Sequence, residues 1–255
     1  MDIAARLCRV LDKKQISGEI YDFWVEYSDV SSVKPGQFVN VKCSGFTLRR
    51  PISICEIDRG NGRLRLVFEV RGEGTRVMSS TEVGGSIDIL APLGNGFNLG
   101  ETSRRAVFVG GGIGVPPLLE AAKPFGKNAD VIIGFRCADA AILKEDFERQ
   151  GNIVTLVTED GSAGEKGFVT APLIRRLEAA PCDVIFACGP RPMLKAVAGE
   201  ADKRSIPCFV SMEEHMACGV GACLSCACKV KMDGREIYAH VCKNGPIFDA
   251  KRIVW

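Results

Sequence analysis

The chain has 255 residues, of which 46% are hydrophobic and 25% are charged, so its composition is that of a globular protein long enough for two or three domains. Its formal net charge of +2 argues against nucleic acid or an anionic membrane as a partner. No apolar run approaches the roughly 18 residues that span a bilayer, and the first residues lack the apolar core of a signal peptide, so we expect a cytoplasmic protein.

Residues 1–100 are predicted to form a small antiparallel β-barrel. Two segments alternate apolar with polar residues, as half-buried strands do. Their apolar faces consist of Tyr21, Phe23, Val25 and Tyr27 in one strand and of Leu64, Leu66, Phe68 and Val70 in the other, with Arg65 and Glu69 opposite. Turns at Pro35-Gly36, Asn61-Gly62 and Gly84-Gly85 punctuate the strands at a spacing typical of a barrel.

Three motifs in this first region favour a flavin site. The motif R-x-x-S runs from Arg50 to Ser53, and an arginine can clamp a pyrophosphate while the serine faces the N5 edge of the flavin ring. Gly72, Gly74 and Thr75 then lie between a strand and a short helix, where free N–H groups can receive phosphate. Residues 91–97 add a glycine-rich turn. Each motif alone could be an ordinary barrel turn or a surface arginine, but their order favours flavin.

Residues 101–206 differ in character, because apolar strands alternate with helical stretches, which predicts a parallel sheet with crossover helices. Between its first strand and first helix lies a glycine-rich turn, in which a backbone can approach the pyrophosphate of a dinucleotide. The turn consists of Gly110, Gly111, Gly112, Ile113 and Gly114. The turn departs from the dinucleotide-binding pattern G-x-G-x-x-G. The alternative to a nucleotide site is a tight turn that only packs the helix on the sheet.

A second candidate for the nicotinamide site is the turn Cys188, Gly189 and Pro190, which ends another predicted parallel strand. Open α/β sheets bind ligands at that edge. Arg136 is either a contact for an adenosine 2′-phosphate or a solvated loop charge, and Glu159 and Asp160 offer carboxylates to a ribose. The two carboxylates tilt the expectation toward NAD, whereas Arg136 does not decide between NAD and NADP.

The last region, residues 207–255, holds six of the twelve cysteines. Cys218, Cys223 and Cys226 follow the spacing C-x4-C-x2-C, and Cys242 completes the plant-type pattern for a [2Fe–2S] cluster. The glycine-rich loop between the first two allows the backbone to wrap a cluster. Structural zinc is the alternative, although its ligands usually come as two C-x2-C pairs.

Six other cysteines are expected to be packing residues, because disulfides are rare in a reducing compartment. These are Cys8, Cys43, Cys137, Cys182 and Cys208, to which we add Cys228, whose alternation with Cys226 on a strand turns it away from the cluster. His215 is interpreted as a loop histidine.

With these three sites in this order, the sequence resembles the ferredoxin-reductase superfamily, and most closely the electron-transfer subunits of NAD-dependent (class B) dihydroorotate dehydrogenases. The resemblance rests on "RRPIS", "GEGT", "PLGNGF", "GGGIGVPPL", "EDGSAGEKGFV", "CGPRPML" and "EEHMACGVGACLSC", which together cover nearly the whole chain. It implies an FAD-binding barrel (1–100), an NAD-binding α/β domain (101–206) and a [2Fe–2S] domain (207–255). The implied FAD contacts are Arg50, Pro51, Ile52, Ser53, Val67, Phe68, Glu69, Gly74 and Thr75.

The resemblance also implies a partner, an FMN-containing catalytic subunit that oxidises dihydroorotate. Two copies of each chain are expected to form a heterotetramer. Electrons would pass from that FMN through [2Fe–2S] and FAD to NAD+ in de novo pyrimidine (UMP) biosynthesis. The 49 residues after Ile206 are too few for the full ferredoxin domain of phthalate-type oxygenase reductases. Gly221-Ala222 stand where related NADP-dependent bifurcating subunits often carry an acid.

Two other functions stay open at this point. The first is a stand-alone or bifurcating NAD(P)H reductase that delivers electrons to ferredoxin or another acceptor. The second, of a different class, is a zinc-stapled binding module without redox activity.

Overall fold

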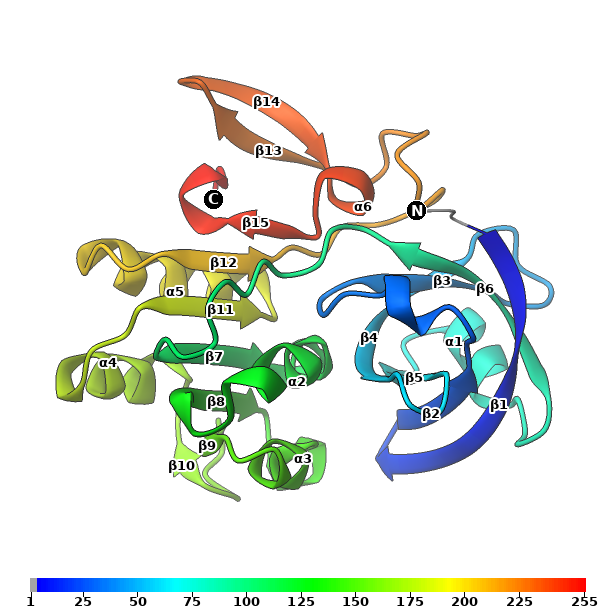
Figure 1. Ribbon diagram of the computed structural model, residues 1–255, viewed down its shortest axis with the longest axis horizontal. Helices are drawn as coiled ribbons and strands as arrows, with labels where there is room; N and C mark the ends of the chain where they lie inside the picture. Colours follow the sequence, from blue (N-terminus) through cyan, green and yellow to red (C-terminus); the bar gives the residue numbers. More distant parts are fainter. Residues whose placement is uncertain (1–3) are drawn as a thin grey trace.

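Six antiparallel strands close into a barrel in the first part of the chain, on the right in Figure 1. The computed structural model describes residues 4–255, so residues 1–3 of the predicted domain 1–100 lie outside the described residues. The strands follow one another around the barrel in the order β1-β2-β5-β4-β3-β6. Their bounds are Ala4–Ser17 (β1), Ile20–Glu26 (β2), Phe38–Lys42 (β3), Arg50–Asp58 (β4), Arg63–Glu69 (β5) and Ser86–Leu93 (β6), with helix α1 at Glu73–Ser79.

The predicted strand faces of the barrel are confirmed. Phe23 and Val25 of β2 and Leu64 and Leu66 of β5 are fully buried in one apolar core inside the barrel. Arg65 lies on the opposite face of β5, as expected, yet only 8% of its surface is exposed. It is buried because the barrel wall packs against the second half of the molecule at this point.

A seven-stranded sheet forms the second part, on the left in Figure 1, in the order β10-β9-β8-β7-β11-β12-β15. All neighbouring pairs are parallel except β12 with β15. The predicted parallel α/β fold is thus confirmed. The strands are Ala106–Gly111 (β7), Ala129–Phe135 (β8), Ile153–Thr158 (β9), Glu165–Lys166 (β10), Val184–Cys188 (β11), Cys208–Ser211 (β12) and Ile247–Asp249 (β15).

Two pairs of helices cover the two faces of this sheet. Helices α2 (Pro116–Ala122) and α3 (Lys144–Arg149) share an apolar core with one set of strand residues, including Phe108 and Phe186. Helices α4 (Thr170–Ala179) and α5 (Arg191–Lys203) share another with the alternate set, including Val107 and Ile185. Successive residues of a strand point to opposite faces, so strands apolar throughout require helices on both sides.

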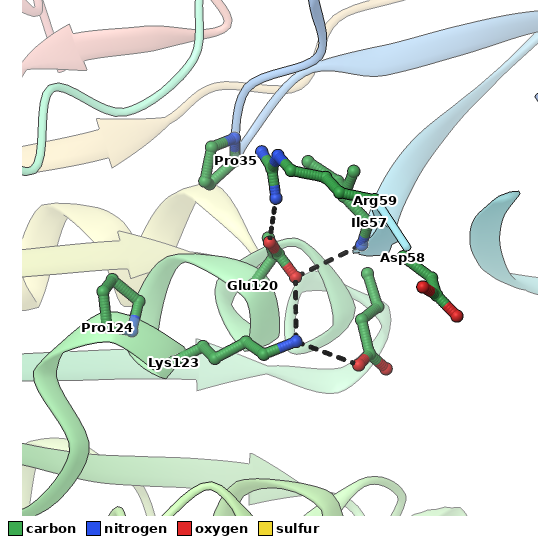
Figure 2. A pocket seen from close by; sticks show the side chains of 8 residues that line it. Pro35, Ile57, Asp58, Arg59, Glu120, Lys123 and Pro124 are labelled. Carbon is green, nitrogen blue, oxygen red and sulfur yellow. Dashed lines mark hydrogen bonds and ion pairs between the residues drawn. The ribbon is translucent and has the colours of Figure 1, made fainter. Parts of the chain in front are cut away.

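Ion pairs between charged side chains join the barrel to helix α2 around a cavity of about 610 Å³ (Figure 2). Figure 2 shows that the buried carboxylate of Glu120 accepts hydrogen bonds from the Ile57 backbone N–H of β4 (3.2 Å) and from Arg59 (3.0 Å). Nearby, Arg65 pairs with Asp22 of the barrel at 2.7 Å and with Asp146 of α3 at 2.6 Å. These contacts fix the barrel against the helix that follows the predicted nucleotide loop.

The C-terminal segment extends the sheet and then caps it. Its hairpin β13–β14 (Ala227–Met232, Arg235–His240) stands above the sheet in Figure 1, followed by helix α6 (Val241–Asn244). Strands β12 and β15 on either side of this hairpin pair within the seven-stranded sheet. The predicted boundary between residues 206 and 207 therefore falls immediately before a strand of the sheet.

Within residues 4–255, no helix is both long and apolar enough to cross a membrane.

Candidate cofactor sites

A cleft of about 250 Å³ opens where the barrel, the sheet and the C-terminal segment meet. Seven of the nine residues predicted to contact FAD line it: Pro51, Ile52, Ser53, Val67, Phe68, Glu69 and Thr75. They come from the adjacent strands β4 and β5 and from helix α1. The structure thus brings together motifs that are about 20 residues apart in the sequence.

The other two residues predicted to contact FAD, Arg50 and Gly74, lie against each other. A Cβ at Gly74 would collide with the Arg50 guanidinium as it lies here, so this side chain crosses the start of α1 close to the backbone. The Arg50 side chain also donates to the Leu48 carbonyl at 2.6 Å and lies 5.1 Å from the centre of the Phe46 ring. These contacts hold the guanidinium between β4 and α1.

The hydroxyl of Thr75 is engaged with the backbone of its own loop. It accepts hydrogen bonds from the N–H groups of Arg71 (3.0 Å) and Gly72 (3.3 Å) and donates to the Gly72 carbonyl (2.9 Å). This side chain shapes the turn between β5 and α1, and so sets the position of the backbone next to Arg50.

The two predicted nicotinamide motifs also meet, at the carboxyl ends of the central strands β7 and β11. Gly110 and Cys188 are direct partners in the parallel ladder. A Cβ at Gly114 would come within 2.6 Å of the Cys188 carbonyl, and one at Gly111 would come within 3.1 Å of Pro190. Strand β7 is flanked by β8 and β11, so the chain reverses its direction of sheet growth here, and ligands of open α/β sheets bind at such a point.

Replacing Gly114 with alanine is expected to raise the KM for NADH by roughly 5- to 150-fold, because the new Cβ must displace the Cys188–Gly189 backbone at a cost of about 1–3 kcal/mol. Steady-state kinetics with an artificial acceptor measure this effect. Gly199→Ala, in helix α5 with nothing within 4 Å of the added Cβ, is the matched control and should leave KM unchanged. An unaltered KM in the Gly114 variant would contradict the assignment of this loop.

The loops after β8 and β9 lie side by side at the same edge of the sheet. The Glu159 N–H donates to the Phe135 carbonyl (3.0 Å) and the Asp160 N–H to the Arg136 carbonyl (3.3 Å). Hydrogen bonds from Ser162 lower the pKa of the Asp160 carboxyl. Arg136, Glu159 and Asp160 are all exposed, so the structure brings these three residues together without deciding what they bind.

The four cysteines predicted as cluster ligands form two pairs of thiols. The Sγ atoms of Cys218 and Cys223 are 3.4 Å apart, and those of Cys226 and Cys242 are 3.3 Å apart. Among residues 4–255, no group of three or more Cys, His, Asp or Glu side chains surrounds a single ion position. Two thiolates on each of two metal atoms suit this arrangement better than four on one tetrahedral zinc.

The loop between Cys218 and Cys223 directs backbone N–H groups at sulfur. Val220, Ala222 and Cys223 all donate to Cys218 Sγ, at 3.5, 3.3 and 3.4 Å. Gly219 and Gly221 have φ values of +73° and +80°, which a side chain would disfavour. Burial opposes ionisation of Cys218, but these hydrogen bonds outweigh it and lower the pKa of the thiol to about 6. The loop is therefore prepared to hold a thiolate.

The cysteines predicted to be packing residues divide into two groups. Cys8, Cys43, Cys208 and Cys228 are buried, and burial raises the pKa of each thiol, which agrees with a packing role. Cys137 and Cys182 are only half-buried. His215 is exposed, and its carbonyl accepts a hydrogen bond from Ser225.

Sequence reasoning missed the contribution of the C-terminal segment to the flavin cleft. Ser211 at the end of β12 and the residues Met212, Glu213 and Met216 after it line the cleft opposite the barrel, and Ile113 of the nucleotide loop joins them. The sequence feature that could have revealed them is their position at the carboxyl end of the strand next to β11, because ligands bind at the carboxyl ends of parallel strands.

The turn 91–97, taken from the sequence as part of the flavin site, contacts the C-terminal segment as well as the barrel. The Asn95 side chain donates to the Lys243 (3.4 Å) and Asn244 (3.1 Å) carbonyls. Gly94 leaves room for Pro246, which a Cβ there would approach to 2.6 Å. This turn joins the barrel to the segment that carries Cys242.

Comparisons with known proteins identify one family model and several full-length relatives. Residues 213–254 match the family described as the iron–sulfur cluster binding domain of dihydroorotate dehydrogenase B. The chain is 39% identical over 249 residues to the dihydroorotate dehydrogenase B (NAD(+)) electron transfer subunit of Caldanaerobacter subterraneus subsp. tengcongensis, covering 97% of both chains. It is 40% identical to the same subunit of Geobacillus sp. (strain WCH70), covering 96% of both.

Solved structures support the same architecture. One describing flavin-based electron bifurcation by NADH-dependent reduced ferredoxin–NADP oxidoreductase aligns with a TM-score of 0.85 and 28% identity, over 98% of this chain and 90% of that one. The ferredoxin reductase of carbazole 1,9a-dioxygenase aligns with a TM-score of 0.68 over 81% of this chain and 68% of that one. At 17% identity, this second likeness shows the fold alone.

Proposed function

The chain belongs to the family of dihydroorotate dehydrogenase B (NAD(+)) electron-transfer subunits, and from this premise we propose which of its residues hold which cofactor. As a member, it is an oxidoreductase subunit of pyrimidine biosynthesis that works with a catalytic subunit. It combines a flavin reductase fold with an iron–sulfur binding region. This assignment selects the electron-transfer subunit over the stand-alone reductase and over the zinc-stapled binding module.

The cleft is the observation that carries the proposal, because all three parts of the chain contribute to it. The residues that line this cleft from the barrel and the C-terminal segment, among them Ser53 and Met212, would hold the flavin of FAD. Arg50, held beside Gly74, would clamp the pyrophosphate. Val67, Phe68 and Glu69 form one wall of the cleft.

NAD binds across the loops after β7 and β11. Gly110–Gly114 and Cys188–Pro190 present backbone at the edge of the sheet, where the absence of side chains allows close approach of a pyrophosphate. Ile113 belongs both to this loop and to the flavin cleft. This shared residue supports placing the nicotinamide next to the flavin ring.

A [2Fe–2S] cluster binds to the two thiol pairs, one pair on each iron. The Cys218–Cys223 pair and the Cys226–Cys242 pair supply the four thiolates. The segment that carries them begins at the flavin cleft with Ser211 and Met212, which supports the proposal that the two redox sites are neighbours.

The cofactors supply the electron chemistry, since a bound flavin exchanges a hydride with nicotinamide and single electrons with an iron–sulfur cluster. The chain contributes position and electrostatics. The N–H groups of Val220, Ala222 and Cys223 stabilise negative charge on sulfur. The Glu120 and Arg65 ion pairs hold the nucleotide domain against the barrel. No side chain of this subunit needs to act as acid or base on the pyrimidine.

Co-purification with the FMN-containing catalytic subunit tests this function. We expect a complex of two copies of each chain that oxidises dihydroorotate with NAD+, and an isolated chain whose flavin and iron–sulfur absorption is bleached by NADH. A chain with both bands that transfers electrons to ferredoxin but binds no catalytic subunit would instead support a stand-alone reductase. A chain with neither band would contradict the proposal.

The loop that carries the cluster ligands is a suitable contact for the catalytic subunit. Leu224, between two ligands, exposes 75% of its surface, and Val220 in the same loop exposes 40%. Exposed apolar side chains at the tip of a redox loop favour burial by a partner. Electron transfer also needs the cluster to lie near the partner's cofactor, so we place the interface at this loop.

Replacing Leu224 with aspartate is expected to weaken association with the catalytic subunit by roughly 10- to 100-fold, because an apolar contact is lost and a charge is buried. Calorimetric titration of one subunit with the other measures the effect. Ile153→Asp is the control and should bind normally. Ile153 is also an exposed apolar residue (57%), but its strand β9 lies toward the edge of the sheet opposite β15. Equal affinity of both variants would place the interface elsewhere.

A further inference from the structure

Asn40 of strand β3 is a buried polar residue whose side chain has no partner in the part of the chain that the structure describes. Its exposed surface is 0%, and neither Nδ2 nor Oδ1 makes a hydrogen bond. An unpaired amide is costly to bury, so such a group in a native protein calls for a partner outside the polypeptide.

The Asn40 amide points at the loop that carries the first cluster ligand. A Cβ at Gly219, the residue after Cys218, would come within 2.6 Å of Asn40 Nδ2. The flanking residues Val39 and Val41 are buried inside the barrel, so alternation along β3 turns Asn40 outward. The lack of a side chain at Gly219 thus lets the cluster loop approach the Asn40 amide closely.

This position also borders the flavin cleft. Asn40 is the ladder partner of Pro51 in β4, and Phe38, two residues earlier, is the partner of Ser53. Phe38, Pro51 and Ser53 all line the cleft. Asn40 therefore stands in the barrel wall between the proposed flavin and the proposed cluster.

On the basis of the proposed function, we propose that Asn40 donates an N–H hydrogen bond from the barrel to a sulfur atom at the Cys218 end of the [2Fe–2S] cluster and thereby raises its reduction potential. The backbone N–H groups of Val220, Ala222 and Cys223 already converge on Cys218 Sγ. A further donor stabilises the more negative, reduced cluster, and hydrogen bonds to sulfur are a principal means of setting such potentials. Asn40 is a positioning residue that couples the flavin barrel to the cluster.

Replacing Asn40 with leucine, which has a similar shape and no donor, tests the proposal in the full-length protein loaded with its cofactors. We expect the cluster to be retained and its reduced-to-oxidised ratio at a fixed ambient potential to fall about tenfold, equivalent to about 59 mV for one electron. Redox titration monitored by electron paramagnetic resonance measures this shift. Val39→Ala, a buried change on the inner face of the same strand, should leave the potential unchanged.

A second measurement uses the unaltered protein, so it does not depend on the folding of the variant. Asparagine labelled with ¹⁵N only in the side-chain amide should show a hyperfine coupling to the reduced cluster, and Asn40→Asp should remove it. A wild-type protein without any iron–sulfur signal would overturn the proposed function and this inference together. An intact cluster with no amide coupling, or with a potential unmoved by Asn40→Leu, would overturn this inference alone.

Discussion

Replacing Cys223 with alanine is expected to abolish NAD-linked dihydroorotate oxidation by the assembled complex, while NADH-dependent reduction of ferricyanide by the flavin persists. Cys223 Sγ lies 3.4 Å from Cys218 Sγ, so the change leaves one iron position with a single protein thiolate. Loss of a ligand removes the cluster or its ability to pass an electron. The flavin and nucleotide sites are built from other residues and should keep their function.

The matched control is Cys228→Ala. Cys228 is buried on β13, two residues after a predicted ligand, and forms part of the apolar core rather than either thiol pair. Its replacement should lower stability slightly and leave both activities intact. Iron content, electron paramagnetic resonance of the reduced protein and the two assays distinguish the variants. A Cys223 variant that still links dihydroorotate oxidation to NAD+ would refute the role assigned to the cluster.

Replacing Arg50 with alanine is expected to raise the Kd for FAD by roughly 30- to 150-fold, from the loss of about 2–3 kcal/mol of charge-assisted hydrogen bonds to the pyrophosphate. The structure holds this guanidinium beside Gly74 and over the Phe46 ring, so it is oriented before the ligand arrives. Titration of the flavin-free protein with FAD, followed by fluorescence, measures the change.

The neighbouring residue provides the control for Arg50. Arg49 donates to the Asp88 carboxylate at 2.9 Å, so its guanidinium is occupied within the barrel. The Kd for FAD of the Arg49→Ala variant should therefore be within a few-fold of the wild-type value. If both variants bind FAD equally well, Arg50 does not clamp the pyrophosphate, and the R-x-x-S interpretation fails.

Local sequence pattern was sufficient for the elements and for the motifs within them. Alternation identified the barrel strands with Phe23 and Leu66 inside, and glycine spacing identified the loop that packs on Cys188. Cysteine spacing selected four thiols that the fold gathers into two pairs. These features depend on residues close together in the chain, so a short window contains the information.

Features that depend on contacts between distant segments were not predictable in this way. The approach of Asn40 to Gly219 joins a barrel strand to a loop about 180 residues later, and no local pattern marks either residue as its partner. Arg65 was placed on the correct face of its strand, but its burial depends on Asp146 of another domain. The pairing of β12 with β11 is likewise a contact between separate segments of the chain, which composition does not show.

Metal and sulfide analysis of anaerobically purified protein tests the central claim most directly, because the proposed path between the catalytic subunit and the flavin passes through the four thiols. The account predicts two irons and two acid-labile sulfides per chain and no stoichiometric zinc. Zinc bound in place of iron, with no sulfide, would contradict it.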